Sequence, residues 1–550
     1  MDDAPPPSST TPAKAVAAIS LLLALAAASW TLNAYKKLKS GVSSVNADVA
    51  ALASSIQSSA GELSKIHGEM AGVTMDMASL KFSLETMGHA TLRQEFIATQ
   101  AAQAQGGFVL LAGDGMAEGL YIPSVAGHPA LNGGMKGAGM ADIQRLLEKI
   151  PRNAAVKMVV IHAGINDATR ACACPGFAEK WESALRSAVD AAISLSSGAV
   201  ALSTILPVET EKPMGARYYD PSKIAALNAI IRKVAAERKI ILIDNDPAFA
   251  KLYTGKVQYT FDGANLNERG YGQWRENMKA ALAGAIQSAA KPDITSPDDL
   301  TAGVIPAGRD LAGNGSTLSP VLADPPSVGH INVRRASTLI QASQIQEDYL
   351  LITGDSITEQ LYLPSLAGYP VINAGFAGGR ARDVLDFLLS LSSGEKIKAI
   401  VIAVGVNDAW SAGLEGNKPE HWRSVYLAAV ERAKILAGDN VVLSAIIPPE
   451  PGKNLSAMFD MRRIEALNGI IRSVAREKKV VLVDNDPVFR MLAAQGKVYT
   501  VDGIHLNNLG FATWRESLQT AISTAFGGNG LKNGDAKGPG ASTDKKGGAK

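Results

Sequence analysis

A serine, an aspartate and a histidine in the C-terminal half of the chain have the residue types of a catalytic triad. Ser356 lies in the segment "ITGDSIT", and Asp502 and His505 lie three residues apart in "DGIHLN". A serine hydroxyl becomes an effective nucleophile only when a base lies within hydrogen-bond reach, and an aspartate can orient that base. These three residues therefore make Ser356 a candidate nucleophile, with His505 as its base and Asp502 to orient that base.

Two other segments supply groups that could stabilise the negative oxygen formed in such a reaction. Gly378 in "NAGFAGG" leaves its backbone N–H open to a ligand, and Asn407 in "GVND" offers a side-chain N–H. Both groups could therefore contribute to an oxyanion hole. Plainer interpretations remain open at this point. Ser356 could be a helix N-cap and His505 a surface histidine. Asn407 could be an ordinary turn residue.

The chain carries this whole pattern twice. The segments "GLYIPSVAGHP", "KMVVIHAGINDA" and "TFDGANLNERGYGQWRE" of the first copy correspond to "QLYLPSLAGYP", "KAIVIAVGVNDA" and "TVDGIHLNNLGFATWRE" of the second. Self-similarity over such a length indicates a tandem duplication. We expect the first copy at 106–288 and the second at 347–526, joined by a Pro/Gly/Ser-rich linker at 289–346.

The first copy lacks the two groups that would do the chemistry. Gly115 stands where the second copy has its serine, and Asn265 stands where it has its histidine. Gly137, Asn166 and Asp262 are retained. Losing either the nucleophile or the base alone costs several orders of magnitude in rate. We therefore predict that the first copy does not turn over substrate and is either a carbohydrate-binding relic or a packing partner for the second.

The elements that must position these residues follow from the hydrophobic pattern. Each copy contains five short runs rich in Val, Ile and Leu, separated by amphipathic helical patterns; in the second copy they are "YLLITG", "PVIN", "IKAIVIAVG", "NVVLSAII" and "KVVLVDN". Continuous apolar runs that alternate with helices indicate a parallel sheet covered on both faces. In such doubly wound folds the functional residues gather at the carboxyl ends of the strands, which is where the four motifs fall.

These four segments, in this order, resemble the SGNH hydrolases, also called GDSL esterases. The resemblance covers each copy nearly from end to end and implies two tandem flavodoxin-like α/β/α domains with five-stranded parallel sheets. It implies that Ser356 is the nucleophile, with His505 as its base and Asp502 orienting that base. The amide of Ser356, Gly378 and Asn407 would then form the oxyanion hole, and no metal or other cofactor is implied.

The N-terminal region is expected to hold the chain on a membrane. The apolar run at 15–35 is long enough to cross a bilayer as a helix, behind a disordered tail at 1–14, although a cleavable signal peptide is the rival interpretation. Apolar residues spaced by three and four from 45 to 87 predict a coiled-coil helix within a stalk at 41–105, and hence a homo-oligomer. The tail at 527–550 is expected to be disordered.

Composition excludes some classes of binding partner but does not identify the substrate. A formal net charge of +2 gives no sign of nucleic-acid binding, and Cys172 and Cys174 are too close in sequence for an ordinary disulfide. Arg380 and Trp410 beside the predicted site suit a sugar or an anionic polymer. By resemblance to bacterial envelope enzymes we expect an O-acetyl esterase with periplasmic domains. The lysine count near the apolar run favours a cytoplasmic orientation instead. A lysophospholipase, thioesterase or acyltransferase of the same superfamily, or an inactive scaffold, are the alternatives.

Overall fold

The computed structural model describes residues 88–104, 106–170, 176–283, 328–392, 396–411 and 419–526, together with scattered residues between 25 and 62. Contacts divide the chain into two units, residues 1–82 and 83–550. The described residues of the first unit are helical and exposed. Most of the predicted membrane helix and most of the coiled coil lie outside the described residues, as do both cysteines and the two predicted disordered tails. Within the described part, no helix is both long and apolar enough to span a bilayer.

The described part of the second unit begins with a helix over residues 88–103. The elements that follow in the first copy are β1 (Phe108–Gly113), α2 (Gly115–Gly119), β2 (Ser124–Val125), β3 (His128–Gly134), α3 (Met140–Lys149), β4 (Val156–His162), α4 (Phe177–Ser196), β5 (Val200–Ser203), α5 (Pro213–Arg217), α6 (Pro221–Arg238), β6 (Ile241–Ile243), α7 (Asp246–Thr254) and α8 (Glu268–Leu282).

The second copy repeats this order with its own set of elements. They are α9 (Val328–Ser343), β7 (Tyr349–Gly354), α10 (Ser356–Gln360), β8 (Ser365–Leu366), β9 (Tyr369–Gly375), α11 (Ala381–Ser390), β10 (Ile397–Ala403), the 3-10 helix η3 (Asn407–Ala409), α12 (Pro419–Ala437), β11 (Val441–Ser444), the 3-10 helix η5 (Ser456–Met458), α13 (Met461–Lys478), β12 (Val481–Val483), α14 (Asp486–Ala494) and α15 (Asn508–Phe526).

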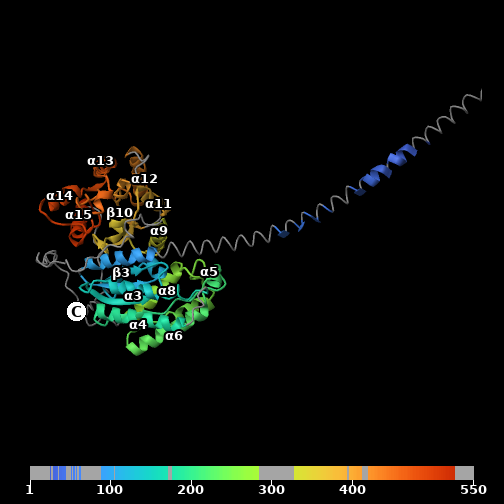
Figure 1. Cartoon of the computed structure of the whole chain (residues 1–550), viewed down its shortest axis with the longest axis horizontal. Coiled ribbons are helices and arrows are strands. Elements are labelled where there is room, and N and C mark those ends of the chain that lie inside the picture. Colours follow the sequence, from blue (N-terminus) through green and yellow to red (C-terminus); the bar gives the residue numbers. More distant parts are fainter. Residues whose placement is uncertain are drawn as a thin grey trace, which may run out of the picture. The chain divides into compact units, whose positions relative to one another are not determined.

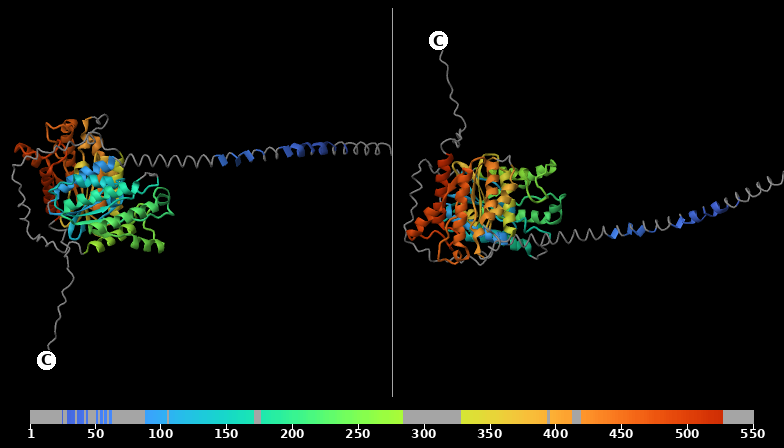
Figure 2. Two further views of the ribbon diagram at one scale, coloured as in Figure 1. Left: turned by 60° about the horizontal axis from the view of Figure 1, so that its bottom comes forward. Right: turned by 90° about the horizontal axis from the view of Figure 1, so that it is seen from above.

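Each copy folds around one sheet with helices packed against it (Figure 1). The strand orders are β2-β3-β1-β4-β5-β6 and β8-β9-β7-β10-β11-β12, so the five parallel strands of each sheet follow the flavodoxin-like order 2-1-3-4-5. The central strands β1 and β7 are buried along their whole length. This matches the continuous apolar runs of the sequence, since strands covered on both faces have no polar side to alternate with. The predicted doubly wound architecture is confirmed, and Figure 2 shows both copies from two other directions.

The sheets have six strands, so the prediction of five was wrong. The sixth is a two-residue antiparallel edge strand, β2 or β8, which pairs with the start of β3 or β9. The connecting turns place Ala126 and Gly127, and likewise Ala367 and Gly368, at positive φ, as a tight two-residue hairpin turn requires. Two residues carry no hydrophobic pattern, so this strand left no signal in the apolar runs.

Two segments that the sequence assigned elsewhere belong to the folded unit. Residues 88–103, placed in the stalk, form a helix whose side chains are mostly buried. The segment predicted as linker contains α9, which packs against β9. Both helices lie before the apolar runs by which the copies were delimited.

Candidate active site

The turn between β7 and α10 presents Ser356 at the carboxyl end of a central strand. Asp355 is the N-cap of α10 and accepts a hydrogen bond from Ile357 N at 3.0 Å, so Ser356 is the first helical residue. The first copy keeps the same cap, with Asp114 accepting from Met116 N. Capping is therefore done by the aspartate, and the serine hydroxyl is left for another role.

The three triad residues predicted from the sequence lie in one hydrogen-bonded line. Ser356 Oγ is 3.0 Å from His505 Nε2, and His505 Nδ1 is 2.6 Å from Asp502 Oδ2. The serine and the histidine are 6% and 7% exposed, so their contact is shielded from most solvent. In the tautomer with hydrogen on Nδ1, the imidazole donates to the carboxylate and its Nε2 accepts from the hydroxyl, which is the arrangement a general base needs.

The loop before α15 fixes Asp502 against its own backbone. Its Oδ1 accepts hydrogen bonds from Ile504 N and His505 N at 2.9 and 2.8 Å, which leaves Oδ2 for the imidazole. Burial raises the pKa of Asp502, but the hydrogen bond and the charge of His505 outweigh it, and the net pKa is below its usual range. The carboxylate therefore stays ionised, as required to orient the imidazole and to stabilise its cation.

The two predicted oxyanion groups come from loops after β9 and β10. Gly378 has a φ of +76°, a conformation that glycine adopts without strain. Asn407 begins η3, and its Nδ2 donates to Gly379 O at 3.0 Å, so one of its two amide hydrogens is used to hold the glycine loop. The next residue, Asp408, accepts from Ala381 N at the start of α11. It ties the two loops together rather than facing the reaction.

The two proposed substrate contacts differ in their surroundings. Arg380 is exposed at the N-cap of α11, and its backbone N–H donates to Asp383 Oδ2. Trp410 is half-buried and packs edge-on against Phe459, with ring centroids 5.4 Å apart. Among the residues that the structure describes, no three His, Cys, Asp or Glu side chains are grouped as metal ligands.

The first copy preserves the frame without the reacting groups. Asn265 Nδ2 donates to Asp262 Oδ2 at 2.6 Å, in the place of the His505–Asp502 contact, and Asn265 is exposed. Gly137 has a φ of +85°, and Asn166 Nδ2 donates to Ala138 O at 2.9 Å, like their counterparts in the second copy. An amide in place of the imidazole cannot take a proton at neutral pH, so this copy has an oxyanion loop but no base.

The position of the missing serine is also partly covered. A Cβ added at Gly115 would meet Lys136 Cγ at 3.1 Å and its Cα at 3.3 Å, which is tighter than ordinary contact. The second copy has alanine, Ala377, at the position of this lysine. Restoring a serine alone would therefore crowd the lysine. His162 of the first copy is buried at the end of β4, with its Nδ1 beside Ser203 Oγ, and does not replace the base.

Sequence reasoning missed one buried carboxylate next to this site. Glu359 lies three residues after the nucleophile in α10, is fully buried, and accepts from Ala377 N at 2.9 Å, one residue before Gly378. Its counterpart Glu118 accepts from Lys136 N at 2.8 Å. The signal was present, because both copies keep glutamate at this position although the serine has been lost from one.

The buried aspartate caps make stability depend on pH. Burial raises the pKa of Asp114 from 3.8 to about 7, with a smaller contribution from the carboxylate of Asp167. Because the folded chain holds this proton to a higher pH than the unfolded chain, the stability linked to Asp114 is complete below about pH 4 and is lost as the pH rises toward 7.

Asp114→Asn keeps the capping acceptor without the charge. We expect it to raise the free energy of unfolding by about 2 kcal/mol near pH 8 and to change it little near pH 4. Urea unfolding at the two pH values measures this difference. A gain of equal size at both would contradict the explanation.

Comparison with known proteins divides the chain into the same two copies. The model of the GDSL-like Lipase/Acylhydrolase family matches residues 105–273 and again 352–512, together more than half of the chain. A comparison with curated proteins found no match.

Each of the solved structures below aligns with about a third of this chain, and the alignment covers most of the other protein's chain. A lipase/acylhydrolase from Enterococcus faecalis is 19% identical, covering 32% of this chain and 96% of its own, with a TM-score of 0.27. The acetyl xylan esterase AlAXEase is 22% identical, covering 31% and 98%, with a TM-score of 0.27. A putative platelet activating factor from Streptococcus pneumonia is 22% identical, covering 34% and 89%, with a TM-score of 0.29.

Proposed function

The chain belongs to the GDSL-like lipase/acylhydrolase family, and from this premise we propose that its second copy is a serine esterase that works through an acyl-enzyme on Ser356. The observation that supports this most directly is the line of hydrogen bonds from Ser356 Oγ through His505 to Asp502. A capping role for the serine would not need the imidazole, and a surface histidine would not be buried between a hydroxyl and a carboxylate.

The reaction would proceed in two halves. Ser356 Oγ attacks the ester carbonyl while His505 Nε2 takes its proton, and Asp502 holds the resulting imidazolium. The backbone N–H groups of Ser356 and Gly378 and the remaining amide hydrogen of Asn407 donate to the oxyanion. His505 then returns the proton to the leaving alcohol, and a water molecule activated in the same way releases the acid. If a second alcohol took the place of water, the same acyl-enzyme would make the protein an acyltransferase.

The substrate we propose is a short acyl ester, in particular an O-acetyl group on a cell-envelope carbohydrate. Arg380 and Trp410 border the second copy's motifs, and an exposed cation and an indole suit a sugar ring or an anionic polymer. We further propose that the apolar run at 15–35 anchors the protein in the membrane, that the heptad pattern at 45–87 joins copies of the chain into a homo-oligomer, and that the two domains lie in the periplasm. A C-terminal reporter that is active only after export tests the orientation.

The first test is whether the protein has a reactive serine at all. We expect purified full-length protein to hydrolyse p-nitrophenyl acetate and to be labelled by a fluorophosphonate at Ser356. Released acetate from a panel of acetylated glycans would then identify the acceptor. A protein inert to both reagents would instead be a scaffold built from two hydrolase folds.

The role of Asn407 gives a prediction of moderate size. Asn407→Ala removes one oxyanion donor, and we expect kcat to fall about 10²-fold with a smaller change in KM. The matched variant Asn166→Ala removes the equivalent amide, which makes the equivalent bond to Ala138 O in the first copy. We expect it to leave kcat unchanged, so steady-state kinetics of the pair separate a role in the reaction from a role in holding the loop.

A further inference from the structure

The tandem repeat begins earlier than its apolar strands suggest. Helix 88–103 reads "GHATLRQEFIATQAAQ". Residues 329–344, which are α9 without its first residue and with one residue beyond its end, read "GHINVRRASTLIQASQ", so a glycine, a histidine, an arginine and two glutamines recur at the same spacing. Most of these polar side chains are buried in both helices; the exposed fraction of Arg93 is 3% and that of Gln103 is 4%. Buried polar side chains are costly unless they are paired, so their partners show what the two helices do.

Helix 88–103 binds the nucleophile helix of the other copy. Gln100 Nε2 donates to Glu359 O at 2.7 Å, and Gln103 Nε2 donates to Gln360 O at 2.7 Å. Gln103 Oε1 in turn accepts from Tyr362 N at 3.1 Å. A five-residue helix leaves most of its carbonyl groups without partners inside the helix. The first copy supplies donors for two of those groups, Glu359 O and Gln360 O, in the helix that begins at Ser356.

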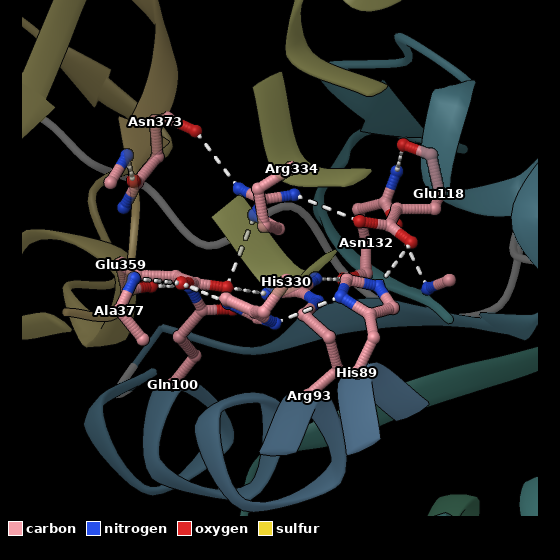
Figure 3. A network of polar contacts seen from close by, with 12 residues as sticks. His89, Arg93, Gln100, Glu118, Asn132, His330, Arg334, Glu359, Asn373 and Ala377 are labelled. Carbon is pink, nitrogen blue, oxygen red and sulfur yellow. Dashed lines mark hydrogen bonds and ion pairs between the residues drawn. The ribbon is translucent and has the colours of Figure 1, made fainter. Parts of the chain in front are cut away.

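The same helix also reaches the oxyanion loop, through Glu359. Figure 3 shows this carboxylate between Arg93 of the first copy and His330 and Arg334 of α9. Burial raises the pKa of Glu359, but the charges of His330, Arg334 and Arg93 outweigh it and bring the pKa down to about 2. The ionised Oε2 accepts from Ala377 N, so an ion network anchored partly in the first copy holds the loop that carries Gly378.

The contacts are reciprocal. Gln341 Nε2 donates to Glu118 O and Gln344 Nε2 donates to Gly119 O, both at 2.6 Å, at the end of the helix that begins with Gly115. Arg334 reaches Glu118 as Arg93 reaches Glu359, at 3.3 and 3.4 Å. At the centre, His89 Nδ1 and His330 Nδ1 lie 2.9 Å apart. Such exchange of equivalent contacts is the pattern of a two-fold interface, here within one chain.

We propose that the degenerate first copy is a built-in positioning subunit for the second. Through Gln100, Gln103 and Arg93 it fixes the nucleophile helix and, by way of Glu359, the oxyanion loop, so both halves together make one competent site. The proposal rests on the proposed esterase function and assigns the inactive copy a role in it. It explains why the helix that once carried the first copy's serine keeps its partners, because the reciprocal contacts stabilise a single shared interface.

The test compares two pairs of substitutions in the full-length protein. Gln100→Ala with Gln103→Ala removes the donors to the active helix, and Gln341→Ala with Gln344→Ala removes the equivalent donors to the inactive one. Hydrolysis of p-nitrophenyl acetate gives kcat and KM. Titration with a fluorophosphonate counts the reactive serines, so that kcat is expressed per competent site and partial unfolding cannot imitate a slower reaction. Thermal unfolding compares the structural effect of the two pairs.

We expect the first pair to lower kcat about 10-fold with KM nearly unchanged, because the serine and its oxyanion donors are displaced while the substrate surface remains. The second pair should lower the melting temperature to a similar extent and keep kcat. Equal loss of kcat in both pairs, or no loss in the first, would overturn the inference while leaving an active serine esterase. An unmodified protein without serine-dependent activity would overturn the proposed function and this inference together.

Discussion

Ser356→Ala is expected to lower kcat for p-nitrophenyl acetate by about 10⁴-fold or more and to abolish fluorophosphonate labelling. The hydroxyl is the only group in this turn that can form the acyl-enzyme, and its partner His505 Nε2 is 3.0 Å away. The fold should be unaffected, because Asp355 caps α10 and an alanine is well tolerated at the first helical position. Steady-state kinetics together with the melting temperature measure both effects.

His505→Ala should have an effect of similar size, and the double variant should be no worse than either single one. Residues that act as one unit lose their combined effect when any member is removed. Asn265→Ala provides the matched control, since this side chain holds the equivalent place in the first copy. If Ser356→Ala still hydrolysed p-nitrophenyl acetate at a substantial rate, or if Asn265→Ala lost activity, the reacting group would lie elsewhere.

The reacting groups could be predicted from the sequence because they lie in short segments at the ends of long apolar runs. The parallel strands were predicted from the same runs, since a strand buried on both faces has an unbroken hydrophobic pattern, whereas their flavodoxin-like arrangement was implied only by the resemblance to the SGNH hydrolases. The edge strands β2 and β8 were missed, because two residues held by a hairpin turn have no such pattern. The geometry of the triad needed coordinates, as 149 residues separate Ser356 from His505.

The helix that completes the interface could not be predicted from hydropathy. His89, Arg93 and Gln100 read as the polar face of a surface helix, yet they are at most 8% exposed. They are buried because the other copy offers them the imidazole of His330 and the carboxylate and backbone carbonyl of Glu359, and such a pairing cannot be recognised in the local sequence pattern. The recurrence of the same polar residues in α9 was the one available signal. The apolar residues that recur in the two copies identify the core of each domain. The polar residues that recur in helix 88–103 and α9 identify the interface between the two domains.

The ion network makes a second large prediction, on stability. Glu118→Ala and Glu359→Ala each remove one carboxylate from a buried group that includes Arg93 and Arg334. Breaking a buried pair leaves the partner's charge uncompensated, so we expect each variant to lose about 3–5 kcal/mol of the free energy of unfolding. Urea unfolding measures the loss. A cost below about 1 kcal/mol in either variant would show that water reaches the arginines and that the interface is loose.

The two variants should differ in what remains active. Per reactive serine, Glu118→Ala should keep its kcat, because Glu118 holds Lys136 N beside a glycine that does no chemistry. Glu359→Ala should lose kcat, because Ala377 N and the loop of Gly378 lose their acceptor. Glu359→Gln keeps an acceptor oxygen but no charge, so it should recover part of the kcat lost in Glu359→Ala while remaining less stable than the unmodified protein. If Glu359→Ala lost stability but kept its kcat per reactive serine, the carboxylate would serve the fold alone, and the oxyanion loop would be positioned by its own glycines.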